Sequence, residues 1–230
     1  MNKDFKLFAN SQGIPTTTLE SYVKHLELTS KTEAPNIINM TPNIIEERQM
    51  NVAVMDVFSR LMKDRTIFFG SGVNDQVANV IVAQLLYLEN TGEEDVNMYV
   101  NSPGGGVYAG LGIVDTMNYI KPDVSTTVVG MAASMGAVIQ CSGAKGKRSA
   151  LKHSRVMIHQ PLGGAQGQAS DMQINLEQIL MLKKELYEII ATNSGQTFEK
   201  VEKDSDRDYW MTSKEAKEYG MIDHIVEKED

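Results

Sequence analysis

GMAASMGA (residues 130–137) consists almost entirely of small residues and follows the β-branched run VSTTVV (residues 124–129). A strand that enters such a turn and continues as a helix brings a side-chain hydroxyl close to the unpaired N–H groups of the first helical turn, which favour negative charge. Ser134 carries the one hydroxyl of this stretch and is therefore a candidate nucleophile. The alternative is that the small residues only pack a helix closely against a sheet.

Strands and helices are predicted to alternate on both sides of this stretch. Apolar, β-prone runs predict strands at 66–69, 96–100, 124–129 and 155–158. Apolar positions spaced by three and four residues predict helices from Asn51 to Lys63, from Asn74 or Asp75 to Thr91, and from Tyr108 to Ile120, and a further helix around residues 138–139. The repeated order of strand and helix predicts an α/β fold with mainly parallel strands and right-handed crossovers.

The C-terminal third is predicted to be more helical. The capping-box pattern at residues 170–173 predicts a helix that runs to about Asn193. Its expected buried side consists of Ile174, Leu176, Ile179, Leu182, Leu186 and Ile190. Shorter helices are expected at 198–203 and at 212–219, and a last strand at 224–226. The Gly- and Gln-rich segment 160–169 is expected to form an exposed loop or an edge strand.

Composition excludes several classes of protein. The net charge is −8 in 230 residues, without a basic stripe, which argues against nucleic-acid binding. The single cysteine, Cys141, makes an internal disulfide impossible and a zinc cluster improbable. The first residues lack the apolar segment of a secretion signal, and no apolar run is long enough to span a bilayer. We therefore expect a soluble, cytoplasmic protein without a metal or another cofactor.

Two regions are expected along the chain. Residues 1–39 contain three consecutive threonines, charged residues and two prolines, with only a weak helical pattern. They are predicted to form an N-terminal extension, which could be a removable pro-segment, a flexible arm or a small docking element. Residues 40–230 are predicted to form one domain.

A serine nucleophile needs a base, and the base needs an orienting carboxylate. His159 ends an apolar strand and precedes a Pro and Gly turn, so it is the favoured base among four histidines, with an ordinary core or edge histidine as the alternative. The run KDSDRDYW (residues 203–210) offers three carboxylates, and position alone does not choose among them. NSPGGG (residues 101–106) is either a tight turn or a loop whose N–H groups accept an anion, and it is not a nucleotide-phosphate motif.

Taken together, these residues resemble the ClpP peptidases, the proteolytic chambers of ATP-dependent proteases. The resemblance covers residues 44 to the carboxyl end. The similar segments are NSPGG (101–105), IKPDVST (120–126), AASMGA (132–137), MIHQP (157–161) and DRD (206–208), in the order found in that family. Because several separate motifs agree, the joint match is highly specific.

The resemblance implies the crotonase-like (ClpP) fold of repeated β-α-β units, with the helix at 170–193 as a protruding handle and the segment 163–169 as a strand that pairs between rings. It further implies that Ser134 is the nucleophile, His159 the general base and acid, and Asp208 the orienting carboxylate. The N–H groups of Gly105 and Met135 are then the oxyanion hole. The order Ser, His, Asp and the absence of G-x-S-x-G argue against an α/β-hydrolase.

The resemblance also implies a homo-oligomer of two stacked heptameric rings that degrades unfolded polypeptides. Arg207 resembles a residue that pairs between rings, and Asp171 is the partner expected for it. ATP hydrolysis would belong to a separate Clp/Hsp100 AAA+ unfoldase, of the ClpX, ClpA or ClpC kind, since this chain has no Walker A motif. Tyr99 and Tyr119 match positions in the family's docking clefts, or are ordinary half-buried aromatics.

Two other functions stay open from the sequence. One is an acyl-CoA enzyme of the wider crotonase group, which also uses a glycine-rich oxyanion loop. The other is a catalytically silent ring subunit. Catalysis that does not need Ser134 would favour the first, and a homomeric preparation that cleaves short peptides would exclude the second.

Overall fold

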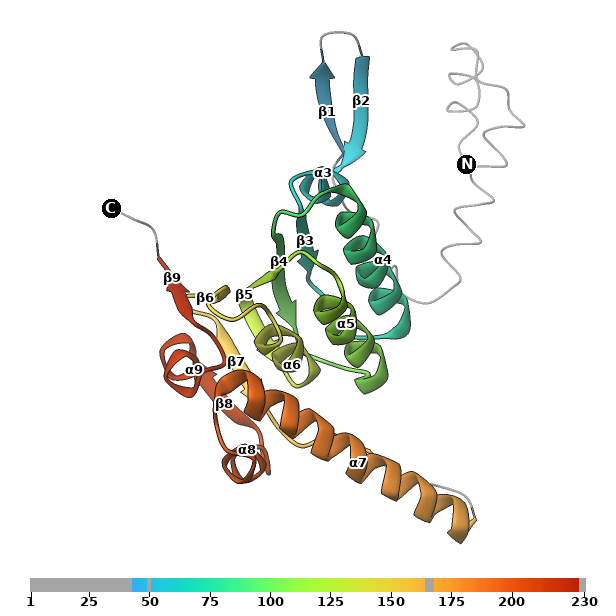
Figure 1. Ribbon diagram of the computed structural model, residues 1–230, viewed down its shortest axis with the longest axis vertical. Helices are drawn as coiled ribbons and strands as arrows, with labels where there is room; N and C mark the ends of the chain where they lie inside the picture. Colours follow the sequence, from blue (N-terminus) through green and yellow to red (C-terminus); the bar gives the residue numbers. More distant parts are fainter. Residues whose placement is uncertain (1–42, 49–50, 164–167, 228–230) are drawn as a thin grey trace, which may run out of the picture. The chain divides into compact units, whose positions relative to one another are not determined.

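The computed structural model describes residues 43–48, 51–163 and 168–227 (Figure 1). The N-terminal extension expected at residues 1–39 and most of the predicted inter-ring strand at 163–169 lie outside these residues. The chain divides into two compact units, residues 1–57 and 58–230, and each is described by itself.

A β-hairpin is the described part of the first unit. Strand β1 (Asn43–Arg48) pairs antiparallel with β2 (Asn51–Asp56), in a register that places Asn43 opposite Asp56. The predicted helix from Asn51 to Lys63 is therefore wrong over its first half, and only α3 (Val57–Lys63) is helical. The spacing of apolar residues fitted a helix. Pairing of β2 with the preceding strand takes precedence over this local propensity, and helical periodicity carries no information about such pairing.

A seven-stranded sheet organises the second unit, with the order β3-β4-β5-β6-β9 and with β7 between β5 and β8. Its strands are β3 (Thr66–Phe69), β4 (Val96–Ser102), β5 (Val124–Ala133), β6 (Arg148–Leu151), β7 (Arg155–Ile158), β8 (Tyr209–Thr212) and β9 (His224–Val226). All of the pairings are parallel except that of β7 with β8. The α/β fold with mainly parallel strands is thus confirmed, whereas β6 and β8 were not predicted.

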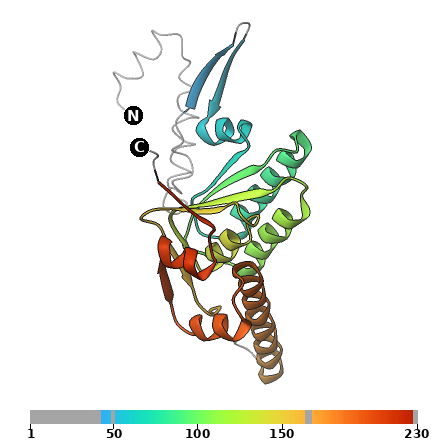
Figure 2. The same cartoon turned by 60° about the vertical axis from the view of Figure 1, so that its left-hand side comes forward.

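Three helices follow strands β3, β4 and β5 and lie side by side along the sheet (Figures 1 and 2). They are α4 (Asp75–Thr91), α5 (Val107–Tyr119) and α6 (Met135–Cys141). Asn74 caps α4, because its side chain accepts a hydrogen bond from the N–H of Val77 at 2.9 Å. The core contains Leu85, Ile113 and Ile139, each fully buried. This packing fixes the point where β5 delivers Ser134 to α6.

Helix α7 (Ala169–Ser194) extends away from the rest of the second unit (Figure 1). The capping box predicted for it is wrong, because its N-cap is Gln168, whose side chain makes no capping bond. Its expected buried side is also wrong toward the amino end, where Ile174 is 64% exposed and Leu176 is 54% exposed. No α7 residue before Leu186 is buried, so the described part of the chain leaves the apolar side chains on the first half of the helix largely exposed.

Two short helices complete the second unit. Helix α8 (Phe198–Asp204) precedes β8, and α9 (Ser213–Tyr219) follows it. The predicted capping box of α9 is confirmed, since Thr212 and Glu215 each bond to the other's main chain, and Gly220 ends the helix in the left-handed conformation. Helix α9 packs against both β7 and β8.

Candidate active site

Ser134 lies in the sharp turn between β5 and α6. Its backbone has φ of +54° and ψ of −125°, a strained conformation for a residue with a side chain. The turn is held because the N–H of Ser134 donates to the carbonyl of Met157 in the neighbouring strand β7, at 2.9 Å. The Ser134 hydroxyl makes no capping bond to α6 and is available to another partner.

That partner is His159, the residue directly after β7. Its Nε2 lies 2.8 Å from Ser134 Oγ, and its Nδ1 lies 3.0 Å from Oδ1 of Asp208. The imidazole is mostly buried, with 16% of the side chain exposed, whereas 61% of the Asp208 side chain is exposed. A histidine whose Nδ1 bonds to a carboxylate leaves Nε2 to take the proton of a hydroxyl.

The pairing of β7 with β8 explains why Asp208 is the carboxylate of this site. Ile158 lies opposite Tyr209 in the antiparallel register, so the next pair outward is His159 and Asp208. Of the other two candidates, Asp204 pairs with Lys200 at 2.6 Å within α8. Strand β8 was not predicted from the sequence, although the β-prone run Tyr209–Thr212 directly after Asp208 was a usable signal.

The glycine-rich loop after β4 lies against the same turn. A Cβ on Gly104 would stand only 2.7 Å from Cβ of Ser134 and 2.9 Å from the Met135 nitrogen. Val73 holds the loop, since its N–H donates to the carbonyl of Gly104 and its carbonyl accepts from Gly106. Within the described residues, the N–H of Gly105 and the N–H of Met135 donate to no group, which leaves two amides free beside Ser134.

A pocket of about 290 Å³ opens beside these groups and is largely apolar. The loop and the Ser134 turn form one wall, and α7 supplies Leu186, Tyr187 and Ile190 from another element. The other apolar members of the lining are Val107, Met135, Val138, Met157, Ile158, Pro161 and Leu162. A substrate side chain that enters this space is therefore in contact with hydrocarbon on several sides.

The far end of α6 is fixed by a buried ion pair. Arg148 donates to Asp223 from both Nε and Nη2, and its Nη1 donates to the carbonyls of Cys141 and Asn193. Burial alone would raise the pKa of Asp223, but hydrogen bonds and the charge of Arg148 outweigh it and lower that pKa. The helix that begins beside Ser134 is thus anchored at both ends.

Burial also raises the pKa of the Cys141 thiol, to about 11. The thiol is fully buried at the end of α6 and is not part of the pocket lining. No group of three His, Cys, Asp or Glu side chains that could hold a metal occurs in the described part of the chain. No helix in those residues has the length and apolar character needed to cross a membrane.

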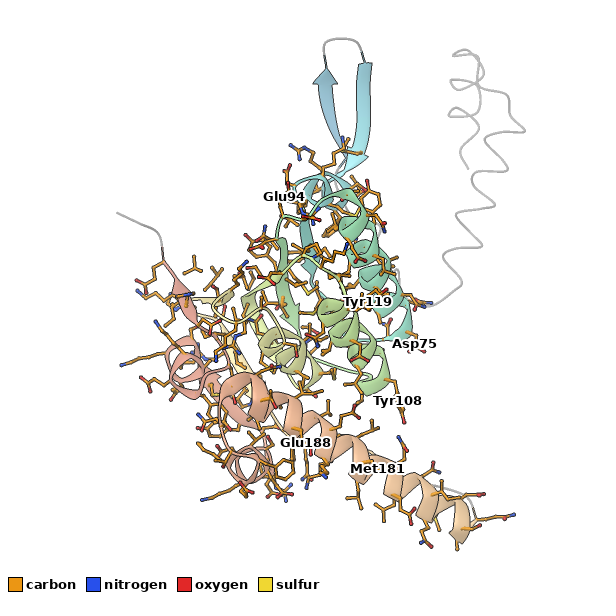
Figure 3. All side chains as sticks on the ribbon, in the orientation of Figure 1. Asp75, Glu94, Tyr108, Tyr119, Met181 and Glu188 are labelled. Atoms are coloured by element: carbon orange, nitrogen blue, oxygen red, sulfur yellow. The ribbon has the colours of Figure 1, made fainter. Side chains whose placement is uncertain are left out.

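The residues expected to mediate assembly and docking lie on the surface of the chain. Arg207 and Asp171 are both exposed, and neither forms an ion pair with another described residue of this single chain. Tyr119 is 76% exposed at the carboxyl end of α5, where Figure 3 labels it, and Tyr99 on β4 is 39% exposed. Both tyrosines are therefore accessible on the surface. Tyr119 is more exposed than the alternative of an ordinary half-buried aromatic requires.

The hydrogen bonds join a serine, a histidine and an aspartate beside two backbone amides. Serine hydrolases use this arrangement of groups. Comparison with known proteins gives the family. The profile of the Clp protease family matches residues 47–229. The chain therefore belongs to the Clp protease family, and it is a serine-type peptidase.

Curated relatives agree with this assignment. Over 190 residues, 82% of this chain, it is 65% identical to the ATP-dependent Clp protease proteolytic subunit of Porphyromonas gingivalis, of which 86% is covered. It is 63% identical over the same length to the protein of that name from Bacteroides fragilis, with 92% covered. It is 53% identical to the ATP-dependent Clp protease proteolytic subunit 2 of a Synechococcus species, with 96% covered.

Proposed function

We propose that Ser134, His159 and Asp208 are the catalytic triad of this peptidase, and that it hydrolyses peptide bonds of unfolded polypeptides through an acyl-enzyme. The observation that carries the proposal is the continuous hydrogen-bonded chain from Ser134 Oγ through His159 to Asp208. Ser134 Oγ attacks the peptide carbonyl while His159 Nε2 takes its proton. His159 then protonates the leaving amine, and water releases the acyl group by the same route in reverse.

The N–H groups of Gly105 and Met135 donate hydrogen bonds to the carbonyl oxygen as negative charge develops on it. Neither N–H donates to another group within the described residues, so both can bond to the tetrahedral intermediate without rearrangement. One such donor contributes about 3 kcal/mol to transition-state stabilisation. The apolar pocket beside Ser134 then holds the side chain that precedes the cleaved bond.

The assembly proposed for this chain is two stacked heptameric rings in the cytoplasm, fed by a separate Clp/Hsp100 AAA+ unfoldase. The relatives' printed names, which describe a proteolytic subunit of an ATP-dependent protease, support a partner that supplies ATP hydrolysis. The exposed apolar side chains on the first half of α7 support ring stacking through this helix. Exposed Tyr99 and Tyr119 are the proposed docking residues for the unfoldase, and residues 1–39 are proposed to be an extension outside the peptidase domain.

A fluorophosphonate probe tests the catalytic assignment directly. We expect the assembled protein to be labelled once per chain at Ser134 and to cleave short fluorogenic peptides. The variant Ser134→Ala should lose both labelling and cleavage while it keeps its native mass. Peptide cleavage that persists in Ser134→Ala would overturn the assignment of Ser134 as the nucleophile, and an assembled protein that is neither labelled nor active would overturn the proposed triad.

A further inference from the structure

The loop that carries Asp208 has little support of its own. Residues 206–208 lie between Ser205, which is fully buried after α8, and Tyr209, the first residue of β8, and all three are exposed. The Asp208 carboxylate is 61% exposed, and its partner within the described chain is His159 alone. A hydrogen bond to an exposed carboxylate is weak because water competes for its oxygens. The position of this carboxylate therefore depends on what holds its main chain.

Gln160, which follows His159 just after β7, holds that main chain. Its N–H donates to the carbonyl of Ser205 at 2.6 Å, and its side-chain Nε2 donates to the carbonyl of Asp206 at 2.9 Å. The Asp206 N–H also donates to the carbonyl of Lys203, but at 3.4 Å, which is long for a hydrogen bond. Of these two hydrogen bonds to Asp206, the one from the Gln160 side-chain amide is therefore the shorter.

We propose that Gln160 is a positioning residue for the triad: its side-chain amide fixes the 206–208 loop so that Asp208 stays in register with His159. The inference rests on the proposed function of Ser134, His159 and Asp208. Gln160 is adjacent to His159 in sequence, so one short segment fixes the imidazole and the loop that orients it. A displacement of about 1 Å in a catalytic group can lower the rate about 100-fold.

The test substitutes Gln160→Met, which keeps the length and volume of the side chain and removes only the amide. A matched control is Gln196→Met, because the Gln196 amide also donates to one main-chain carbonyl, that of Tyr219, at 2.8 Å and away from the site. We expect Gln160→Met to lower kcat for a fluorogenic peptide by about 10- to 100-fold, with KM within twofold. Gln196→Met should keep the kcat of the unchanged protein.

A double substitution separates positioning from a general structural role. The rate constant for fluorophosphonate labelling of Ser134 is measured in Asp208→Asn and in Asp208→Asn combined with Gln160→Met. If Gln160 acts through Asp208, the two labelling rates agree within twofold. If Gln160→Met lowers the rate in the Asp208→Asn background as much as it does in the wild-type protein, the inference is overturned. If Gln160→Met has the same kcat as the wild-type protein, the inference about Gln160 is overturned. The proposed function of the triad then still holds, because the wild-type protein is active. An unchanged protein that neither cleaves peptide nor binds the probe overturns the proposed function as well.

Discussion

Gly104 and Gly146 have nearly the same left-handed backbone, with φ of +89° and +84°, but opposite surroundings. A Cβ added at Gly104 would lie 2.6 Å from the carbonyl oxygen of Ala133 and 2.7 Å from Cβ of Ser134. A Cβ added at Gly146 would meet nothing within 4 Å. The two glycines therefore separate the cost of the backbone conformation from the need for close approach at the active site.

We predict that Gly104→Ala lowers kcat for peptide hydrolysis by at least about 100-fold, because the loop must move away from Ser134 and the Met135 amide. Gly146→Ala should keep the activity of the unchanged protein. Both variants should lose about 1 to 2 kcal/mol of unfolding free energy from the left-handed conformation, which chemical denaturation measures. Similar activities of the two variants would contradict the placement of the loop against the nucleophile.

Cys141 gives a second prediction at the scale of one residue. Because burial raises its pKa to about 11, the thiol is protonated at neutral pH and cannot act as a nucleophile. We expect iodoacetamide at pH 8 to leave the native protein unmodified and fully active, and to modify Cys141 once denaturant unfolds the chain. Rapid modification of the native protein, followed by mass spectrometry, would show that α6 opens at its carboxyl end.

At the scale of elements, the Arg148 and Asp223 pair joins β6 to the chain before β9. The Arg148 side chain is 4% exposed and that of Asp223 is 18% exposed. Removal of one partner from a buried pair leaves an uncompensated charge, so Asp223→Asn should cost about 3 kcal/mol of unfolding free energy. Glu188→Gln is the control, because its exposed pair with Lys184 in α7 contributes less than about 1 kcal/mol.

The same pair gives the pH dependence of stability a definite sign. The pKa of Asp223 is lowered in the folded chain, so its contribution is complete above about pH 4, near the unfolded-state pKa of an aspartate, and is lost as the pH falls further. The stability difference between the unchanged protein and Asp223→Asn should therefore shrink below pH 4. A constant difference between pH 6 and pH 2.5 in urea titrations would contradict this assignment.

Local patterns predicted the elements that depend on short-range chemistry. The β-prone run of β3 and the capping box of α9 are examples, since both signals lie within a few residues. Pairing between distant segments did not show in the sequence, which is why β2 was predicted as a helix and β8 was missed. Asp208 could be assigned only through the family resemblance, because the register of β7 and β8 is what separates it from Asp204 and Asp206.

At the scale of the whole molecule, the single chain leaves apolar side chains on helix α7 exposed. Five apolar side chains on the first half of α7 are more than a third exposed: Met172, Ile174, Leu176, Leu180 and Met181. An exposed apolar surface of this kind marks an interaction site. Figure 3 shows Met181 on the part of α7 that extends from the remainder of the second unit. In the proposed assembly a second ring covers this surface.

Arg207 directly precedes Asp208 in the chain, so its proposed role in assembly predicts a link to catalysis. If Arg207 pairs with Asp171 of a facing ring, the contact between rings also holds the loop that orients His159. We predict that Arg207→Ala lowers native mass toward single rings and lowers peptidase activity in parallel, whereas Lys214→Ala, which removes an exposed cation on α9, changes neither. Native mass spectrometry and peptide cleavage on the same samples measure both effects. Single rings of Arg207→Ala with full activity would show that the triad is aligned without the second ring.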